Sequence, residues 1–530
     1  MIRPFHLATL SIAAALTIAA SALAQPAPSP LPIAPAHLPR LGAVDPRFQS
    51  YNIEMLEVTG GRFWAPYKQQ TSGPAAVADT AAAGPGGMPA SLYRNRAPID
   101  LTNPRLRMLA AALGPAYLRV SGTWANSTWF QDNDDPTPAK PPTGFGGVLT
   151  HAQWRGVLDF SKAVDAPIVT SFAVSTGVRD ANGLWTPAEA QKFLDFTHAN
   201  GGKIAAAEFF NEPTFATLGG APKGYDAAAY GRDFHVFQAF LHQAAPETKI
   251  LGPGGVGEGG SLGTMPGMKL IRSEDMLSEE GPGLDGFSYH YYGGVSKRCA
   301  MMGAAGQTTP AAALSADWLA RTEKDEAFYA ALRDRFTPGK PIWLTETGET
   351  ACGGNPWAST FLDSFRYLNQ LGTLAQRGVQ VVMHNTLAAS DYALIDEATL
   401  TPRPNYWSAL LWHRLMGPTV LDPGKPSSPD LLLYAQCLPN HPGGVAILAI
   451  NADRSQPHAL ALPTASTRYT LSEPNLADGG VELNGAPLAL TSQGMLPTLA
   501  GLPAAKGAVT LAPATITFLA IPKAGNSACR

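Results

Sequence analysis

Eight short apolar runs alternate with helical patterns between residues 48 and 416, and this alternation constrains the fold more than any other feature of the chain. Most runs are followed by a segment whose apolar residues recur at helical spacing. Eight strand–helix repeats in about 370 residues are typical of a (β/α)8 TIM barrel. The runs are residues 50–58, 116–121, 167–175, 204–210, 249–253, 284–291, 341–346 and 379–387.

The clearest helix is predicted at residues 186–199. Thr186 is the expected N-cap, Pro187 the first helical residue, and Glu189 the residue that completes a capping box. Two insertions account for the barrel's generous size: a Gly/Pro/Ala-rich stretch at 71–98 and a segment at 127–148. The second contains four consecutive acidic or amide residues, 132–135, but their spacing fits no calcium loop, so we expect a solvated loop.

The pattern changes after about residue 418, where short apolar runs are separated by turn residues with little helix between them. Such a pattern is typical of a β-sandwich, and 530 residues are too many for one ordinary core. We therefore predict a catalytic-type barrel at 47–417 and a β-sandwich domain at 418–530, with a strand near 40–48 added to its sheet. The stretch 508–521 is predicted as the last strand.

The first 24 residues have the features of a signal peptide. Arg3 supplies the positive start, Leu7 to Ala20 is apolar, and Ala22-Leu23-Ala24 provides small residues before the expected cleavage site. The alternative, a membrane anchor, needs a longer apolar stretch. We predict a secreted or periplasmic protein, with residues 25–46 as a loose Pro/Ala-rich leader.

Four cysteines remain after that cleavage, and an even number in an oxidising compartment favours two disulfides. Cys352 lies six residues after Glu346 and Cys299 follows the run at 284–291, so these two are able to meet. Cys437 and Cys529 both belong to the C-terminal region. Of the three possible connectivities we expect Cys299–Cys352 with Cys437–Cys529; four free thiols are the alternative.

Charge and motifs exclude several classes of function. The formal net charge is −3, whereas a nucleic-acid binder is usually basic. The sequence has no His-Glu-x-x-His, Cys-x-x-Cys or Walker motif, and the glycines at 252–260 lack the Lys-Ser/Thr of a phosphate loop. We expect no metal, no cofactor, no nucleic acid and, after cleavage, no membrane; the oligomeric state is not predicted.

Two carboxylates at strand ends point to chemistry. Glu212 lies in Phe-Phe-Asn-Glu-Pro after the fourth run, and Glu346 ends the seventh. Functional groups of a (β/α)8 barrel gather at the C-terminal ends of its strands, so both side chains should face one pocket. A pair of carboxylates is the minimum equipment for glycoside hydrolysis, and the Asn211 amide is placed to hold a sugar hydroxyl.

Several segments resemble glycoside hydrolase family 79, the family of heparanase and its bacterial relatives. Trp343-Leu344-Thr345-Glu346-Thr347 followed by Gly353-Gly354 is similar to the family's nucleophile segment. The other similar segments are Leu106 to Thr123, Ser288-Tyr289-His290-Tyr291-Tyr292, Tyr392 to Asp396 and Asn405-Tyr406-Trp407. The similarity covers most of residues 48–422.

The resemblance implies a role for individual residues. Glu212 matches the family's acid/base and Glu346 its nucleophile. Tyr292 matches a tyrosine that hydrogen-bonds the nucleophile, and Arg119 at the second strand end supports the same carboxylate by charge. Gly353, Gly354 and Tyr392 match groups that bind a uronic-acid carboxylate. The remaining implied substrate contacts are Asn52, Glu54, Thr123 and His290.

Some positions leave alternatives open. Residues 52–54 differ from the mammalian pattern, which leaves the sugar contacts there undecided. Glu349, three residues after Glu346, is a rival nucleophile, although it lies past the predicted strand end. His290 is either a substrate contact or a structural hydrogen-bonding group.

We predict a retaining exo-β-glucuronidase that acts on glucuronate-containing oligo- or polysaccharides. The chain is acidic overall, and the two insertions are placed to close one end of the pocket. An endo-acting heparanase-type enzyme, which would need an open basic cleft, is the first alternative. A non-catalytic carbohydrate-binding protein on the same fold is the second.

Overall fold

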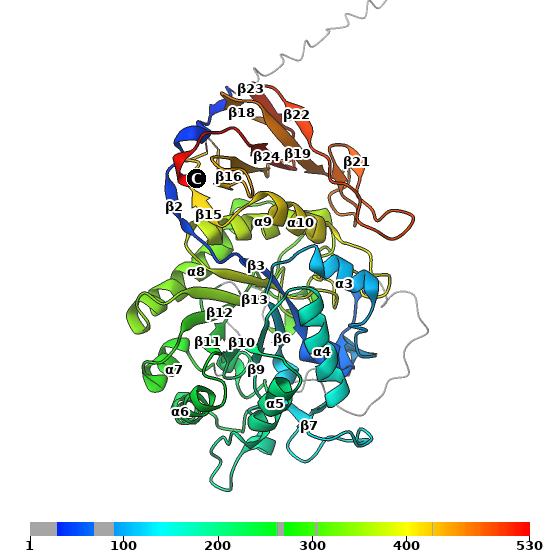
Figure 1. Ribbon diagram of the computed structural model, residues 1–530, viewed down its shortest axis with the longest axis vertical. Helices are drawn as coiled ribbons and strands as arrows, with labels where there is room; N and C mark the ends of the chain where they lie inside the picture. Colours follow the sequence, from blue (N-terminus) through cyan, green and yellow to red (C-terminus); the bar gives the residue numbers. More distant parts are fainter. Residues whose placement is uncertain (1–28, 68–88, 261, 263–269, 303–305, 427) are drawn as a thin grey trace, which may run out of the picture.

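The structure, a computed structural model, describes residues 29–67, 89–260, 262, 270–302, 306–426 and 428–530. Eight parallel strands close into a barrel, which confirms the predicted fold (Figure 1). Each strand overlaps one predicted run, because strands buried on both faces are nearly continuous apolar segments. In barrel order they are β3 (Gln49–Glu54), β6 (Leu118–Ser121), β9 (Ile168–Ser171), β10 (Ile204–Glu208), β11 (Lys249–Val256), β12 (Gly286–Tyr292), β13 (Ile342–Gly348) and β14 (Val381–His384).

Helices surround the barrel, one after nearly every strand (Figure 1). Side chains from five strands form a separate apolar cluster, which includes Val169, Leu251 and Trp343; this cluster fills the barrel interior. The interior is therefore a packed apolar core at the level of this cluster. The helices are α1 (Met55–Thr59), α3 (Pro104–Ala111), α4 (His151–Ala163), α5 (Ala188–Ala199), α6 (Ala227–Ala244), α7 (Ser273–Glu280), α8 (Ala316–Phe336), α9 (Phe361–Gln376) and α10 (Pro404–Leu415).

A β-sandwich follows the barrel. Its larger sheet has nine strands: β2 (Arg40–Ala43), β15 (Thr419–Leu421), β16 (Leu431–Cys437), β17 (Val445–Asn451), β19 (Ser466–Ser472), β20 (Glu482–Leu483), β21 (Ala486–Pro487), β22 (Leu502–Ala504) and β24 (Thr515–Ile521). The smaller sheet has three: β1 (Leu31–Pro32), β18 (His458–Leu462) and β23 (Gly507–Leu511). Apolar residues of both sheets share one core.

Helix α9 joins the two parts of the molecule. Nearly all its residues are buried, because the barrel covers one side and strand β16 the other. The Tyr434 ring lies directly over Gly372, where a Cβ would come within 2.3 Å of it. The Tyr434 hydroxyl donates to Asn369 Oδ1 at 2.7 Å. The sandwich is therefore packed onto the barrel.

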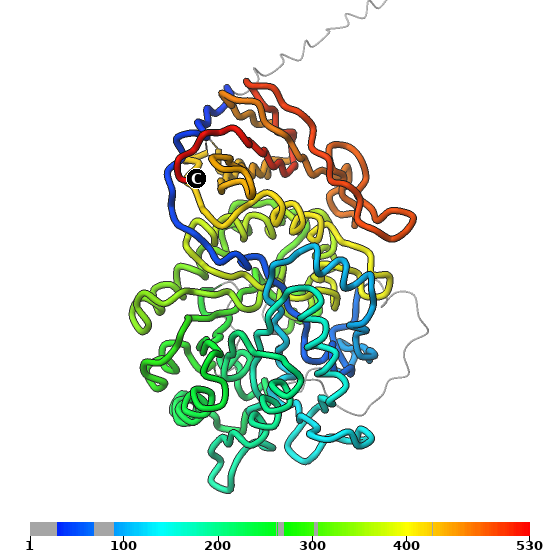
Figure 2. Tube along the Cα trace, viewed as in Figure 1, coloured from blue at the N-terminus to red at the C-terminus, as the bar shows by residue number. Residues whose placement is uncertain are grey.

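Residues 31–43 are not loose, in contrast to the expected leader. Strand β1 pairs with β18, and β2 pairs with β15 at the edge of the larger sheet, where a strand near 40–48 is predicted. Asn526 donates from Nδ2 to the carbonyls of Pro35 and Leu38. The N-terminal segment thus runs beside the C-terminal end of the chain (Figure 2). The predicted signal peptide, residues 1–24, lies outside the described residues.

Two local predictions are wrong. Residues 508–521 form two strands, β23 and β24, because Pro513 has no N–H for a ladder and Ala514 has a φ of 47°. Helix α5 begins after Pro187 without a capping box. Thr186 donates its hydroxyl to Val178, and Glu189 accepts the Phe130 N–H at 2.8 Å instead. Within the described residues, no helix combines the length and apolar character needed to cross a membrane.

Candidate active site

Glu212 and Glu346 lie together at the C-terminal end of the barrel strands. Glu346 is part of β13, and Glu212 follows β10. One carboxylate oxygen of each and one ring nitrogen of His290 all lie within 4.8 Å of one another. Glu212 has φ 48° and ψ 60°, a left-handed conformation that is strained for a non-glycine residue and is concentrated at functional sites.

Two donors hold the Glu346 carboxylate. The Tyr292 hydroxyl donates to Oε1 at 2.7 Å, and Arg119 donates from a terminal nitrogen to Oε2 at 2.8 Å. The Glu346 side chain is only 6% exposed. A charged donor and a short phenol hydrogen bond both stabilise a negative charge on this carboxylate.

Glu212 is in a different environment. Its side chain is 19% exposed, and its one short contact is His290 Nδ1 at 3.2 Å from Oε1. Burial raises the pKa of Glu212 above its ordinary value, and the charge of Glu346 acts in the same direction, while the His290 hydrogen bond opposes both. Among the described residues, Glu212 lacks a guanidinium donor within hydrogen-bond distance of the kind that holds Glu346.

His290 is fully buried and has charged groups on both sides. Arg119 lies 3.2 Å and Glu208 3.7 Å from Nε2, while Glu212 and Glu346 lie 3.2 and 3.9 Å from Nδ1. Burial lowers the pKa of His290, but the charge of Glu346 and the neighbouring Glu208 and Glu212 carboxylates outweigh burial and Arg119, raising it to about 9.

Glu208 is a third carboxylate of the site, which the sequence analysis missed. It is the last residue of β10, and its side chain is 1% exposed. Oε2 accepts from Arg119 Nε at 3.2 Å and from a terminal nitrogen at 2.8 Å; Oε1 accepts from Thr345 Oγ1 at 2.6 Å. Burial opposes its ionisation most strongly, but the Arg119 charge, the contact with His290 and the Thr345 hydrogen bond together outweigh burial and hold the pKa of Glu208 well below its usual range.

Asn211 is fixed on both its backbone and its side chain. Asn126, which the sequence analysis also missed, accepts the Asn211 N–H and donates to the Asn211 carbonyl, each at 2.8 Å. Arg119 donates to Asn211 Oδ1 at 2.8 Å. The side-chain nitrogen of Asn211 is thereby turned away from the guanidinium and is the amide atom left to donate to a ligand.

Gly353 and Gly354 follow β13 and both have a φ of 82°. A Cβ at Gly353 would lie 2.7 Å from Trp64 Cβ, and one at Gly354 would lie 3.1 Å from the Tyr392 backbone nitrogen. Only glycine fits this conformation and this close packing. Successive backbone N–H groups in such a turn suit an anion.

Asn385, another residue that the sequence analysis missed, connects the glycine turn with Glu346. Its Nδ2 lies 3.0 Å from the Tyr292 hydroxyl, 3.1 Å from the Tyr392 hydroxyl and 3.0 Å from Glu54 Oε1. Asn385 Nδ2 has two hydrogens for these three acceptors, so they share its hydrogen bonds. The Tyr292 hydroxyl donates its own proton to Glu346.

The predicted contacts on β3 and β6 lie nearby. Burial and the charge of Glu346 raise the pKa of Glu54 well above its ordinary value. Its Oε2 lies against Gly122, directly before Thr123, where a Cβ would come within 1.5 Å. Asn52 donates from Nδ2 to the Thr345 carbonyl at 3.2 Å, so this amide faces the strand that carries Glu346.

Glu349, the alternative nucleophile, is hydrogen-bonded within the loop that follows β13. Its carboxylate accepts from Thr350 Oγ1, Asn355 N and Asn355 Nδ2. Burial and the charge of Asp363 raise its pKa to about 7.

Both expected disulfides form. Cys299–Cys352 links the residue directly before Gly353 to the loop after β12, and the other disulfide is Cys437–Cys529.

A layer of side chains covers the glycine turn. Trp64 packs on Gly353, and Asp391 donates its backbone N–H to the Gly353 carbonyl at 3.1 Å. Arg298 donates to the Asp391 carboxylate at 2.7 Å and stacks on Tyr67, with its guanidinium carbon 4.0 Å from the ring centroid. Segments after β3, β12 and β14 thus meet over one end of the site.

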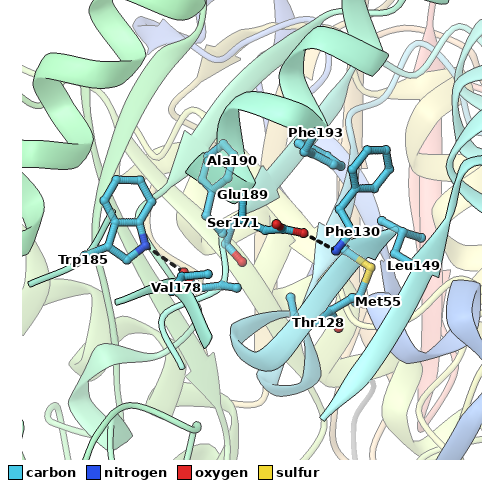
Figure 3. A pocket seen from close by; sticks show the side chains of 13 residues that line it. Met55, Thr128, Phe130, Leu149, Ser171, Val178, Trp185, Glu189, Ala190 and Phe193 are labelled. Atoms are coloured by element: carbon cyan, nitrogen blue, oxygen red, sulfur yellow. Dashed lines mark hydrogen bonds between the residues drawn. The ribbon is translucent and has the colours of Figure 1, made fainter. Parts of the chain in front are cut away.

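Two other places in the barrel do not form a ligand site. A cavity of about 40 Å³ between α5 and the strand ends has a largely apolar wall, apart from polar groups such as Glu189 and Ser171, and holds little more than water (Figure 3). In the acidic loop, Asp132 and Asp134 lie 3.5 and 3.1 Å from the two ring nitrogens of His151, so these carboxylates already have a partner.

Comparisons with known proteins find related chains. The sequence profile of "Glycosyl hydrolase family 79, N-terminal domain" matches residues 94–372. Heparanase of Mus musculus is 28% identical over 490 residues, covering 81% of this chain and 88% of its own. Heparanase-like protein 1 of Arabidopsis thaliana is 26% identical over 486 residues, covering 81% of this chain and 86% of its own.

A solved structure shares the fold. The 4-O-α-L-rhamnosyl-β-D-glucuronidase of Fusarium oxysporum 12S superposes with a TM-score of 0.60 at 13% identity, covering 93% of this chain and all of that one. The likeness extends over nearly the whole of both chains, so the fold of barrel and C-terminal domain is shared with that structure.

Proposed function

This chain belongs to glycosyl hydrolase family 79 and is a glycoside hydrolase, and we propose that it is a retaining exo-β-glucuronidase. The observation that supports this most is the pairing of Glu212 with Glu346 beside a glycine turn suited to a carboxylate. Retaining glycosidases have carboxyl groups about 5–5.5 Å apart, whereas inverting enzymes leave about 6.5–9.5 Å for a water molecule. Oxygens of Glu212 and Glu346 within 4.8 Å favour retention.

In the first step Glu346 attacks the anomeric carbon while Glu212 gives its proton to the leaving oxygen. Arg119 and Tyr292 hold the attacking carboxylate by a hydrogen bond to each of its oxygens. The raised pKa of Glu212 keeps the proton available. Asn211 Nδ2 donates to the sugar hydroxyl next to the anomeric carbon, a contact that strengthens as the transition state forms.

In the second step Glu212 works as a base and activates water against the glycosyl-enzyme. Esterification removes the negative charge of Glu346, which is one of the causes that raise the pKa of Glu212. The same carboxyl therefore gives up a proton more easily in the step that requires it as a base.

The carboxylate of a uronic acid is assigned to Gly353, Gly354 and Tyr392. Backbone N–H groups and a phenol hold an anion without placing a mobile cation beside the nucleophile. No metal is needed there, and Arg119, 2.8 Å from Glu346 and 3.2 Å from His290, would repel one from that cluster.

Exo action is supported by what covers the glycine turn. In a hexuronic acid the carboxylate-bearing carbon is bonded to C4, so a chain extended from O4 must pass the group that binds the carboxylate. Trp64 and the Tyr67–Arg298–Asp391 cluster occupy that neighbourhood. A terminal glucuronate avoids this layer, whereas an internal one meets it.

Product analysis tests the proposal. Wild-type enzyme should release only monomeric glucuronate from a glucuronate-terminated oligosaccharide, with the β-configuration seen first by NMR. Release of internal fragments would support endo action of the heparanase type, the alternative that the names of the curated relatives favour. No turnover of an aryl β-glucuronide at any pH would favour a non-catalytic carbohydrate-binding protein.

We also propose that the enzyme acts outside the cytoplasm, secreted or periplasmic. Two disulfides suit an oxidising compartment, and the N-terminal sequence has the features of a signal peptide.

A further inference from the structure

Glu208 is a buried carboxylate that the mechanism above does not use. It lies four residues before Glu212, and all its short contacts are to groups that touch Glu212 or Glu346 or are their neighbours. A carboxylate that is 1% exposed is retained only where its charge is matched. Arg119 supplies the opposite charge to Glu208. It also pairs with Glu346, so one guanidinium is shared between two carboxylates.

His290 lies on the path from Glu208 to Glu212. Its Nε2 faces Glu208 Oε1 at 3.7 Å, and its Nδ1 faces Glu212 Oε1 at 3.2 Å. The ring is fully buried on β12, so its orientation is set by these neighbours. Arg119, which lies 3.2 Å from Nε2, carries only donors. Without a negative charge beside it, Arg119 would drive the proton off Nε2.

We propose that Glu208 is a positioning residue for the acid/base: by balancing Arg119 it keeps a proton on His290, whose Nδ1–H then holds and stabilises the ionised form of Glu212. This inference rests on the proposed role of Glu212. Four charged groups face His290 from the elements packed against it: Arg119 on β6, Glu208 on β10, Glu212 after β10 and Glu346 on β13. Of the three carboxylates, Glu208 is the one with no contact to the reacting sugar in the mechanism above.

The arrangement answers a specific need of a double displacement. Burial and Glu346 favour the protonated form of Glu212, whereas a charged His290 favours the ionised form. A group that must be an acid in one step and a base in the next needs both influences. Loss of Glu208 should remove the influence of the charged His290, so the pKa of Glu212 should rise further and Glu212 should release its proton less readily.

The pH dependence of kcat/KM on an aryl β-glucuronide tests this in the full-length enzyme. In Glu208→Gln the alkaline limb should move up by about one pH unit, the size expected for loss of one nearby charge. In a His290→Asn background the same substitution should cause no further shift, because the two residues act as one unit. Glu280→Gln is the matched control: Glu280 is equally buried and bonds Tyr230, outside the site.

An unmoved limb in Glu208→Gln, or a shift that persists in the His290→Asn background, would overturn the inference. A second measurement does not depend on a variant at Glu208. In ¹⁵N-histidine-labelled wild-type enzyme, His290, assigned by its loss in His290→Asn, should carry protons on both ring nitrogens at pH 7.5; a neutral ring overturns the inference. Absence of wild-type turnover would instead refute the proposed function, and the NMR result would still decide whether His290 carries the second proton that the inference requires.

Discussion

Replacing Tyr392 by phenylalanine isolates the recognition of the substrate carboxylate. The Tyr392 ring is buried and lies 6.3 Å from the ring of Tyr292, so removal of one oxygen leaves the packing in place. Asn385 loses one of three acceptors but keeps Glu54 and Tyr292, so the support of Glu346 is unchanged. The substitution therefore removes one donor to the ligand and little else.

A hydrogen bond to a charged group contributes about 1.5–3 kcal/mol. At about 1.4 kcal/mol per tenfold, kcat/KM for 4-nitrophenyl β-glucuronide should fall about 10- to 150-fold. For the matching β-glucoside, which has no carboxylate, kcat/KM should stay within about threefold of wild type. Most of the loss should be in KM, because the carboxylate is bound equally in the ground and transition states.

Tyr406→Phe is the matched control. Its hydroxyl donates to the Leu109 carbonyl at 2.9 Å on the outer layer of the barrel, so the glucuronide-to-glucoside ratio should not change. Equal losses on both substrates in Tyr392→Phe, or a ratio equal to that of wild type, would refute the assignment of Tyr392 to the carboxylate.

Three further predictions concern the same site. Glu346→Gln should abolish turnover of the aryl glucuronide while circular dichroism and Tm stay close to wild type; residual activity above about one part in a thousand would contradict its role as nucleophile. Because the pKa of Glu212 is raised, its proton is present below that pKa and kcat/KM should fall as pH rises through it; in Glu212→Gln, assayed with a 2,4-dinitrophenyl glucuronide, this alkaline limb should disappear. Converting Cys437 and Cys529 to serine should lower stability by about 4 kcal/mol at most without changing kcat/KM, whereas the same change at Cys299 and Cys352 should also raise KM for glucuronides; equal KM in both variants would show that the second disulfide does not position the glycine turn.

The barrel was predictable because its strands are buried on both faces and stand out as apolar runs. Glu346 was recognisable for a related reason: a charged residue at the C-terminal end of an apolar barrel strand lies where functional residues gather. Glu208 has the same property, at the end of β10, but it precedes the more distinctive Asn211-Glu212 and was not recognised. Its partner Arg119 is 89 residues away, a proximity that only the closed barrel creates.

Predictions failed where a residue distant in sequence takes the hydrogen bond that a local motif would use. The spacing at α5 fits a capping box, yet the Glu189 carboxylate accepts the N–H of Phe130 instead. Asn126 bonds the backbone of Asn211, 85 residues away, and Asn385 bonds the phenol of Tyr292, 93 residues away. Amides of this kind have no sequence signature, because their role depends on which partners the fold brings within about 3 Å.

The edge strands β1 and β2 also bear on how the protein is made. A ribosome synthesises them first, yet their partners β18 and β15 follow more than 350 residues later. The sandwich cannot close until the whole barrel has been synthesised, and loop closure over such a span is slow. Residues 31–43 therefore stay unpaired during synthesis of the barrel. In a chain truncated before Thr419, β1 and β2 would have neither of their partner strands.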